Sequence, residues 1–148
     1  MKIGAVGLGN RIAHVFHELS QINKNAELIS YVDPLPIGKE YAEKHNFFPS
    51  KNYSNLKEML NNEKLDLLMV GSPNHLHLEH IKVGLNSGIK IFAEKPIVVD
   101  EDQSFELAKL LGEFGHHEVL VGLVLRYSQH ARSVRELIKT NVLGNIIS

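Results

Sequence analysis

Short apolar runs alternate with segments of helical periodicity along this 148-residue chain. The runs carry few charges, as expected of strands that are buried on both faces of a parallel sheet. We expect six strands, which are residues Lys2–Val6, Glu27–Val32, Asn46–Phe48, Leu65–Gly71, Ile89–Ala93 and Glu118–Leu123. The alternation predicts the α/β class in three α/β/α layers, with a doubly wound, mainly parallel sheet.

The segments between the strands place apolar residues three and four positions apart, which is the spacing of one helical face. We expect helices over residues 11–20, 36–45, 54–62, 74–86, 100–114 and 128–140. One stripe of the last helix collects Ala131, Val134, Leu137 and Ile138. We expect this stripe to face the protein interior.

Composition and charge narrow the possible functions. Hydrophobic residues make up 43% and charged residues 22% of the chain, which is ordinary for a globular domain. The formal net charge of -1 gives no reason to expect nucleic acid or a membrane as a partner. The chain contains no cysteine, which excludes disulfides, thiolate catalysis and cysteine-ligated zinc. No apolar run approaches the roughly 18 residues of a membrane span, and we expect a cytoplasmic protein.

A glycine turn, Gly7-Leu8-Gly9-Asn10-Arg11, follows the first expected strand and opens a helix. Free N–H groups at the start of a helix bind phosphate, so this setting is typical of a dinucleotide-binding loop. The third small residue of the usual pattern is Ile12 here. That position serves helix–strand packing, so we expect the helix to lie slightly further from the sheet without loss of a phosphate donor. The alternative is a tight turn that binds nothing.

Asp33 ends the second expected strand, 26 residues after Gly7. An acidic side chain near this spacing accepts hydrogen bonds from the ribose of a dinucleotide and repels the 2′-phosphate of NADP. Together the glycine turn and Asp33 predict binding of NAD in preference to NADP. The alternative for Asp33-Pro34 is a turn without a ligand.

Polar turns also follow the later strands. Ser72-Pro73-Asn74 with His77 follows the fourth strand, and Glu94-Lys95-Pro96 follows the fifth. Ligands of open parallel sheets bind beyond the carboxyl ends of the strands, so we expect these turns to share one cleft. A lysine there holds a substrate hydroxyl or assists proton transfer, which makes Lys95 the candidate catalytic residue. The alternative is a surface lysine before a proline.

The fourth expected helix begins among three histidines, His75, His77 and His80. We expect Asn74 to be its N-cap, because asparagine side chains accept hydrogen bonds from free N–H groups there. Neither cysteine nor a clear set of carboxylates accompanies the histidines, so we expect no metal site.

Taken together, these motifs resemble the glucose–fructose oxidoreductase / inositol dehydrogenase / MocA (Gfo/Idh/MocA) family over essentially the whole chain. The specific part is Pro73-Asn74-x-x-His77 followed by Glu94-Lys95-Pro96. The resemblance implies an NAD(P)-dependent oxidoreductase that acts on CH–OH groups of sugars, cyclitols or related polyols. It also implies an NAD(P)-binding Rossmann domain over residues 1–125. Residues 126–148 are then a connecting helix and the start of a C-terminal α+β domain that is missing from this chain.

The resemblance also implies site residues. The residues that it assigns to cofactor binding are Gly7, Gly9, Asn10, Arg11, Ile12, Asp33, Ser72, Pro73, Asn74, His77, Glu94, Lys95 and Arg126. The family's acid/base residues belong to the second domain, so we expect this chain to bind cofactor without turning over substrate. We expect the intact protein to be a homo-oligomer. Two alternatives stay open, namely an NAD-dependent glycosidase of the same family and a non-catalytic NAD-binding module.

Overall fold

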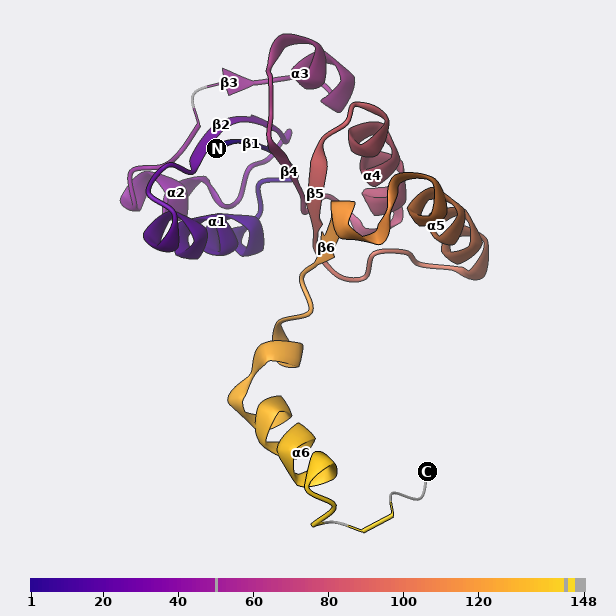
Figure 1. Cartoon of the computed structure of the whole chain (residues 1–148). Helices are drawn as coiled ribbons and strands as arrows, with labels where there is room; N and C mark the ends of the chain where they lie inside the picture. The colour runs from indigo at the N-terminus through magenta and orange to yellow at the C-terminus, as the bar shows by residue number, and fades with distance from the viewer. Residues whose placement is uncertain (50, 143, 146–148) are drawn as a thin grey trace.

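The computed structural model describes residues 1–49, 51–142 and 144–145. A sheet of six parallel strands lies at its centre in the order β3-β2-β1-β4-β5-β6 (Figure 1). In this order the chain moves outward from β1 to β3 and then returns to the centre for β4. The order is that of a doubly wound Rossmann fold, and it confirms the predicted fold class.

The strands are β1 (Lys2–Val6), β2 (Glu27–Val32), β3 (Lys51–Asn52), β4 (Leu67–Val70), β5 (Lys90–Ala93) and β6 (Val119–Val121). The helices are α1 (Asn10–Ile22), α2 (Lys39–Lys44), α3 (Leu56–Asn62), α4 (His77–Asn86), α5 (Glu101–Phe114) and α6 (Gln129–Lys139). Three short 3₁₀ helices are η1 (Asn74–Leu76), η2 (His116–Glu118) and η3 (Val124–Tyr127). Helices α1 and α2 lie on one side of the sheet, and α4 and α5 lie on the other (Figure 1).

Apolar clusters hold the helices on both faces of the sheet, because successive strand side chains point to opposite faces. A further cluster joins α5 to α4 through Leu107, Leu110 and Leu78. On the α1 side, Phe16 packs in a cluster with Ile3 and is 1% exposed. On the opposite side, Met59 of α3 and Ile81 of α4 pack in a cluster with Leu68, and all three are fully buried. Burial of each large side chain stabilises the fold by about 1.5–3 kcal/mol. The two layers therefore fix the strand ends that carry the polar turns.

The third strand lies later in the chain than predicted. It is Lys51–Asn52, whereas residues 46–48 form the turn and extended segment that follow α2. Asn46 there adopts a left-handed φ of 59°, and the backbone N–H of Phe47 donates to the carbonyl of Ala42. The Phe47 ring then packs against the α1-side cluster. The apolar residues that suggested a strand thus anchor the end of the helix instead.

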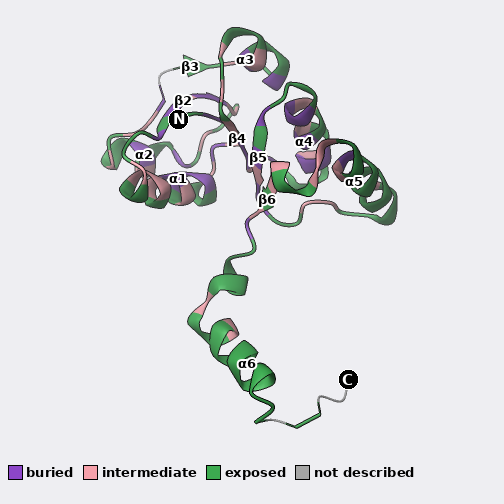
Figure 2. Cartoon of the chain, in the orientation of Figure 1, coloured by how far each residue is buried: buried purple, intermediate pink, exposed green. Residues whose placement is uncertain are grey.

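The prediction that the apolar stripe of α6 faces inward is wrong. The helix extends away from the sheet, and most of its surface is exposed (Figures 1 and 2). Val134, Leu137 and Ile138 are 51%, 41% and 45% exposed. The helix itself forms as predicted, with Ser128 as an N-cap that accepts from the Ala131 N–H. Periodicity thus predicted the helix correctly but not its packing.

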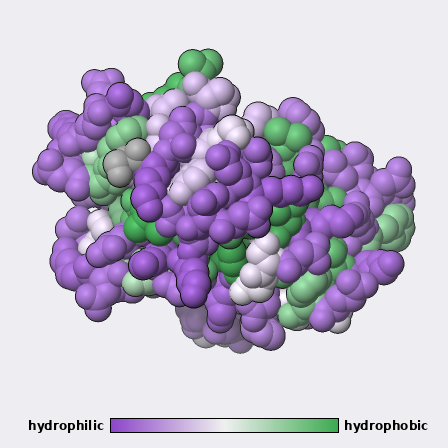
Figure 3. Space-filling view, turned by 90° about the horizontal axis from the view of Figure 1, so that it is seen from above, coloured by the Kyte–Doolittle hydropathy of each residue, from purple (hydrophilic) through white to green (hydrophobic). Residues whose placement is uncertain are grey.

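The surface seen from above is mostly hydrophilic, with smaller apolar patches between charged side chains (Figure 3). Among the described residues, no helix is long and apolar enough to cross a membrane. The expected start of a second domain after α6 falls partly on residues 146–148, which lie outside the described residues.

Candidate cofactor-binding site

The carboxyl ends of the strands open into two adjoining pockets that share Gly9, Gly71 and Ser72. We call the larger one, of about 630 Å³, the Asp33 pocket, since Asp33 and the residues around it form one wall. We call the smaller one, of about 350 Å³, the Lys95 pocket. The structure therefore brings the turns after β1, β2, β4 and β5 to one cleft, as the doubly wound topology requires.

The glycine turn after β1 has the geometry of a phosphate-binding loop. Gly7 has a φ of +82°, and a Cβ there would lie 2.3 Å from the backbone nitrogen of Ser72. Gly7 is thus required both by its left-handed backbone and by the close approach of the next turn. Gly9 is the N-cap residue of α1, and no side chain caps that helix. The first N–H groups of α1 therefore stay available for an anion.

Ile12, which departs from the usual glycine pattern, is accommodated by Gly71 at the end of β4. Ile12 is 1% exposed and belongs to the α1-side cluster. A Cβ on Gly71 would lie only 2.2 Å from Cγ1 of Ile12. The small residue that permits close packing therefore lies on the strand rather than on the helix. Sequence analysis missed Gly71, although a glycine at the end of an apolar strand is the available signal.

Asp33 is held by two backbone donors before any ligand is present. Its Oδ2 accepts from the N–H of Leu8 at 2.7 Å, and its Oδ1 accepts from the N–H of Leu35 at 2.8 Å. The first bond ties the end of β2 to the glycine turn. Each carboxylate oxygen keeps a further lone pair, which leaves acceptor capacity for a ribose hydroxyl.

Gly38, another residue that sequence analysis missed, supports the same turn from α2. Its N–H donates to the carbonyl of Leu8 at 2.9 Å. A Cβ on Gly38 would lie 2.7 Å from the carbonyl oxygen of Gly9. The start of α2 thus packs directly on the phosphate-binding loop, and a larger residue would displace it.

Ser54 and Asn55 form part of the wall of the Asp33 pocket that sequence analysis did not identify. The Asn55 side chain caps α3 by accepting from the N–H of Glu58 at 2.9 Å. The Glu58 carboxylate in turn accepts from the N–H of Ser54 at 3.1 Å, in a reciprocal cap. The hydrogen bond from the Ser54 hydroxyl lowers the pKa of Glu58. The pattern Ser54-Asn55 before Glu58 was the sequence signal for this cap.

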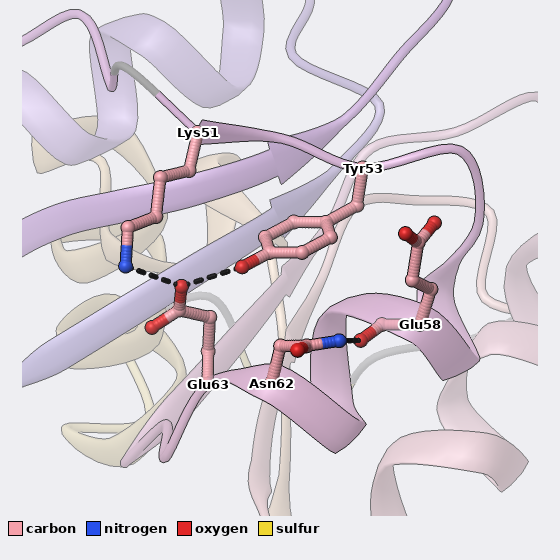
Figure 4. Close-up of polar contacts among 5 residues, drawn as sticks. All are labelled: Lys51, Tyr53, Glu58, Asn62 and Glu63. Atoms are coloured by element: carbon pink, nitrogen blue, oxygen red, sulfur yellow. Dashed lines mark hydrogen bonds and ion pairs between the residues drawn. The ribbon is translucent and has the colours of Figure 1, made fainter.

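A second polar cluster fixes the strand that leads into this wall (Figure 4). Glu63 accepts from Tyr53 Oη at 2.6 Å and from Lys51 Nζ at 2.7 Å with the same oxygen, Oε1. The hydrogen bonds from Lys51 and Tyr53 lower the pKa of Glu63, and the bond to Glu63 raises the pKa of Lys51. The cluster ties β3 to the end of α3 and thereby positions the Ser54-Asn55 turn between them.

An ion pair crosses the Lys95 pocket. Nε of Arg11, at the start of α1, donates to Oε1 of Glu94 at 2.9 Å. Glu94 is 8% exposed, and a Cβ on Gly122 would lie 2.8 Å from its Oε1. Gly122 therefore provides the space for this carboxylate, which sequence analysis did not foresee. Lys95 is exposed at the mouth, where its ammonium is free to meet a ligand.

His77 borders the Lys95 pocket from its inner side and is 1% exposed. Its Nδ1 lies 2.7 Å from the carbonyl oxygen of Pro96, and its Nε2 lies 2.7 Å from that of Ser72. The Ser72 hydroxyl lies 2.8 Å from Nδ1 of His80. Burial lowers the pKa of His80, and the neighbouring His77 lowers it further. These contacts join the turn after β4 to the turn after β5.

Three other predicted site residues differ in whether they border the two pockets. Asn74 borders the Lys95 pocket, but it begins η1, and the N-cap position of α4 falls to Leu76. The prediction that Asn74 caps α4 is therefore wrong, because a 3₁₀ turn precedes the helix. Asn10 and Arg126 are exposed and line neither pocket. Within the described ranges, no cluster of three histidine, cysteine, aspartate or glutamate residues is arranged to hold a metal ion.

Comparison with known proteins agrees with this geometry. Residues 1–123 match the family GFO_IDH_MocA, described as an oxidoreductase family with an NAD-binding Rossmann fold. A glucose-6-phosphate 3-dehydrogenase of Bacillus subtilis is 30% identical over 99% of this chain and 40% of its own length. An inositol 2-dehydrogenase/D-chiro-inositol 3-dehydrogenase of Lactiplantibacillus plantarum is 22% identical over 97% of this chain and 41% of its own length.

Solved structures show the same similarity. A scyllo-inositol dehydrogenase from Lactobacillus casei with bound NAD(H) and scyllo-inositol superposes with a TM-score of 0.80 at 25% identity. The match covers 99% of this chain and 43% of that one. This chain thus spans about two-fifths of the length of the curated relatives that it matches.

Proposed function

The chain belongs to the Gfo/Idh/MocA family of oxidoreductases, and on that premise we propose that it binds NAD(H) for hydride transfer. The substrate is a sugar, cyclitol or related polyol that reacts at a CH–OH group. The observation that carries the proposal is the hydrogen bond from Leu8 to Asp33, which joins the glycine turn and the acidic residue into one preformed site.

The two pockets suit the two halves of a dinucleotide. The Asp33 pocket takes the adenosine, with its ribose on the Asp33 carboxylate, and the N-terminus of α1 takes the pyrophosphate. The negatively charged 2′-phosphate of NADP would be repelled by the Asp33 carboxylate, so NAD is the preferred cofactor. The nicotinamide enters the Lys95 pocket near Glu94, Ser72 and Asn74.

Lys95 is the proposed catalytic residue of this chain. Bound NAD supplies the hydride acceptor or donor. The exposed ammonium of Lys95 donates a hydrogen bond to the reacting substrate oxygen and polarises it. The acid/base residue lies in the second domain, so the chain alone binds cofactor without turnover. Within the chain, residues 1–125 form the cofactor domain, and residues 126–148 lead into the second one.

The setting of the enzyme is part of the same proposal. The intact protein is a homo-oligomer whose second domain covers the cleft, and its partner is a small-molecule substrate rather than nucleic acid or a membrane. We place the protein in the cytoplasm, where it would use the NAD present there.

A calorimetric titration of the chain with NADH and, separately, with NADPH tests the proposal. We expect NADH to bind at least about tenfold more tightly, which corresponds to about 1.4 kcal/mol of repulsion between Asp33 and the 2′-phosphate. Tighter binding of NADPH would overturn the role of Asp33. Binding of neither cofactor would overturn the proposal that this chain holds a preformed dinucleotide site.

A further inference from the structure

The ring of His77 is enclosed between two backbone carbonyl groups. Both ring nitrogens lie 2.7 Å from a carbonyl oxygen, Nδ1 from Pro96 and Nε2 from Ser72. The side chain is 1% exposed, so water does not replace either partner. The two carbonyls belong to different turns, one after β4 and one after β5.

The chemistry of these partners fixes the number of protons on the ring. A carbonyl oxygen only accepts hydrogen bonds, and a neutral imidazole has one N–H and one acceptor nitrogen. Either neutral tautomer therefore leaves a ring lone pair facing a carbonyl lone pair at 2.7 Å in a buried site. Only the imidazolium, which donates from both nitrogens, satisfies both contacts.

We propose that His77 carries two protons and acts as a cationic brace that positions Lys95 by holding the Ser72 and Pro96 carbonyls. Pro96 directly follows Lys95, so the bond to its carbonyl limits the movement of the Lys95 backbone. The part concerning Lys95 rests on the proposed function, whereas the protonation of the ring does not. His77 is thus a positioning residue at the inner wall of the Lys95 pocket.

Three titratable groups lie near the brace, namely His80, Glu94 and Lys95. His80 is the neighbouring titratable group on α4, and burial lowers its pKa against the opposing effect of Glu79, with a smaller lowering by His77. The Ser72 hydroxyl also lies within hydrogen-bond distance of Nδ1 of His80, so Ser72 is held at its side chain as well as at its carbonyl. On the β5 side, Glu94 is already paired with Arg11, and Lys95 reaches solvent.

Nuclear magnetic resonance on the whole, unmodified chain tests the protonation directly. In long-range ¹H–¹⁵N spectra at about pH 8, an ordinary histidine has lost its second proton. We expect both His77 nitrogens to resonate as protonated nitrogens. The His77 ring signals are assigned by their loss from the spectrum of His77→Asn. Where that variant does not fold, they are assigned by the slow solvent exchange expected of buried ring protons. A bare nitrogen on His77 at this pH overturns the brace.

A double-mutant cycle tests whether the brace acts through Lys95. His77→Gln keeps one donor, so we expect it to weaken NADH binding by about tenfold, the worth of one hydrogen bond from a charged group. In a Lys95→Ala background the same substitution should change the affinity less than about twofold. Equal weakening in both backgrounds overturns positioning of Lys95. If the unmodified chain binds no NADH, the proposed function fails, and the resonance result still decides the protonation of His77.

Discussion

The carboxylate of Asp33 in one pocket is bonded to two backbone N–H groups, whereas the carboxylate of Glu94 in the other is paired with the side chain of Arg11. Asp33 accepts from the N–H groups of Leu8 and Leu35. Arg11 and Glu94 form a side-chain pair, and the Arg11 side chain is 48% exposed. A carboxylate held by two backbone donors has little freedom left to lose, whereas the half-exposed Arg11 side chain can move away from the buried Glu94 carboxylate when a ligand binds.

This difference in hydrogen bonding predicts different roles for the two pockets. A preformed Asp33 pocket gives affinity, because the cofactor does not have to order it on binding. An adjustable Lys95 pocket suits the nicotinamide end of the cofactor. There, Glu94 and a cofactor phosphate compete for the guanidinium of Arg11. Substitutions in the first pocket should therefore act on folding and affinity, and those in the second should act on local geometry.

Gly7→Ala should have the largest effect. The new Cβ would lie 2.3 Å from the backbone nitrogen of Ser72, and alanine disfavours the φ of +82°. Neither obstacle is a flexible side chain, so we expect a loss of about 2 kcal/mol or more in the free energy of unfolding. Urea unfolding measures it. Gly112→Ala is the control, since nothing lies within 4 Å of its Cβ position inside α5. That variant should be neutral or slightly more stable, and equal losses would contradict the prediction.

Asp33→Asn should reduce the preference for NADH over NADPH by about tenfold or more, because the repulsion of the 2′-phosphate disappears. The asparagine oxygen still accepts one of the two backbone N–H groups, so most of the loop geometry is kept. Parallel titrations with both cofactors give the ratio. Asp102→Asn, an exposed residue of α5, is the charge-matched control and should leave the ratio unchanged. An unchanged ratio in Asp33→Asn would show that selectivity arises elsewhere.

The sequence predicted the features whose signal is local. Strands β1 and β2 have the predicted bounds, because buried strands between glycine and Asp-Pro turns read as continuous apolar runs. The strand β3 was misplaced, because a two-residue edge strand, Lys51–Asn52, has exposed side chains and no apolar pattern. The outward direction of α6 was also missed, because an amphipathic pattern predicts a helix but does not identify the surface on which its apolar face packs.

The candidate site was predictable to the same extent. Gly7, Asp33, Glu94 and Lys95 lie in the cleft because each follows a strand at its carboxyl end. The compensation of Ile12 by Gly71 depends on a contact between distant segments, which no local pattern contains. The same holds for the space that Gly122 leaves for Glu94.

Gly122→Ala tests the adjustable pocket with the same kind of change as Gly7→Ala. Its Cβ would lie 2.8 Å from Oε1 of Glu94, which is the end of a side chain and not backbone. We expect the carboxylate to shift within its buried site, with about 1 kcal/mol lost in the free energy of unfolding, which is less than for Gly7→Ala because no backbone has to move. The displacement should free Arg11, and resonance of its Nε–H should report the broken pair. A loss in the free energy of unfolding as large as that of Gly7→Ala would contradict the description of the Lys95 pocket as adjustable.

The smallest expected effect concerns acid stability at the Ser54-Asn55 wall. Hydrogen bonds from Lys51 and Tyr53 lower the pKa of Glu63 in the folded state. A lowered pKa contributes stability that is present above the unfolded value of about 4.3 and is lost as the pH falls through the folded value. The raised pKa of Lys51 adds no change in this window, because its contribution is present at every pH below about 10.4.

Glu63→Gln should therefore flatten part of the acid limb of the stability profile. Urea midpoints measured from about pH 6 down to about pH 3 should fall less steeply in this variant than in the unmodified chain. Glu113→Gln removes an exposed carboxylate of α5 and should keep the original slope. Because the cluster positions the wall of the Asp33 pocket, NADH affinity should decline over the same acid range in the unmodified chain and less in Glu63→Gln. A parallel decline in both would contradict the role of the cluster in positioning the pocket.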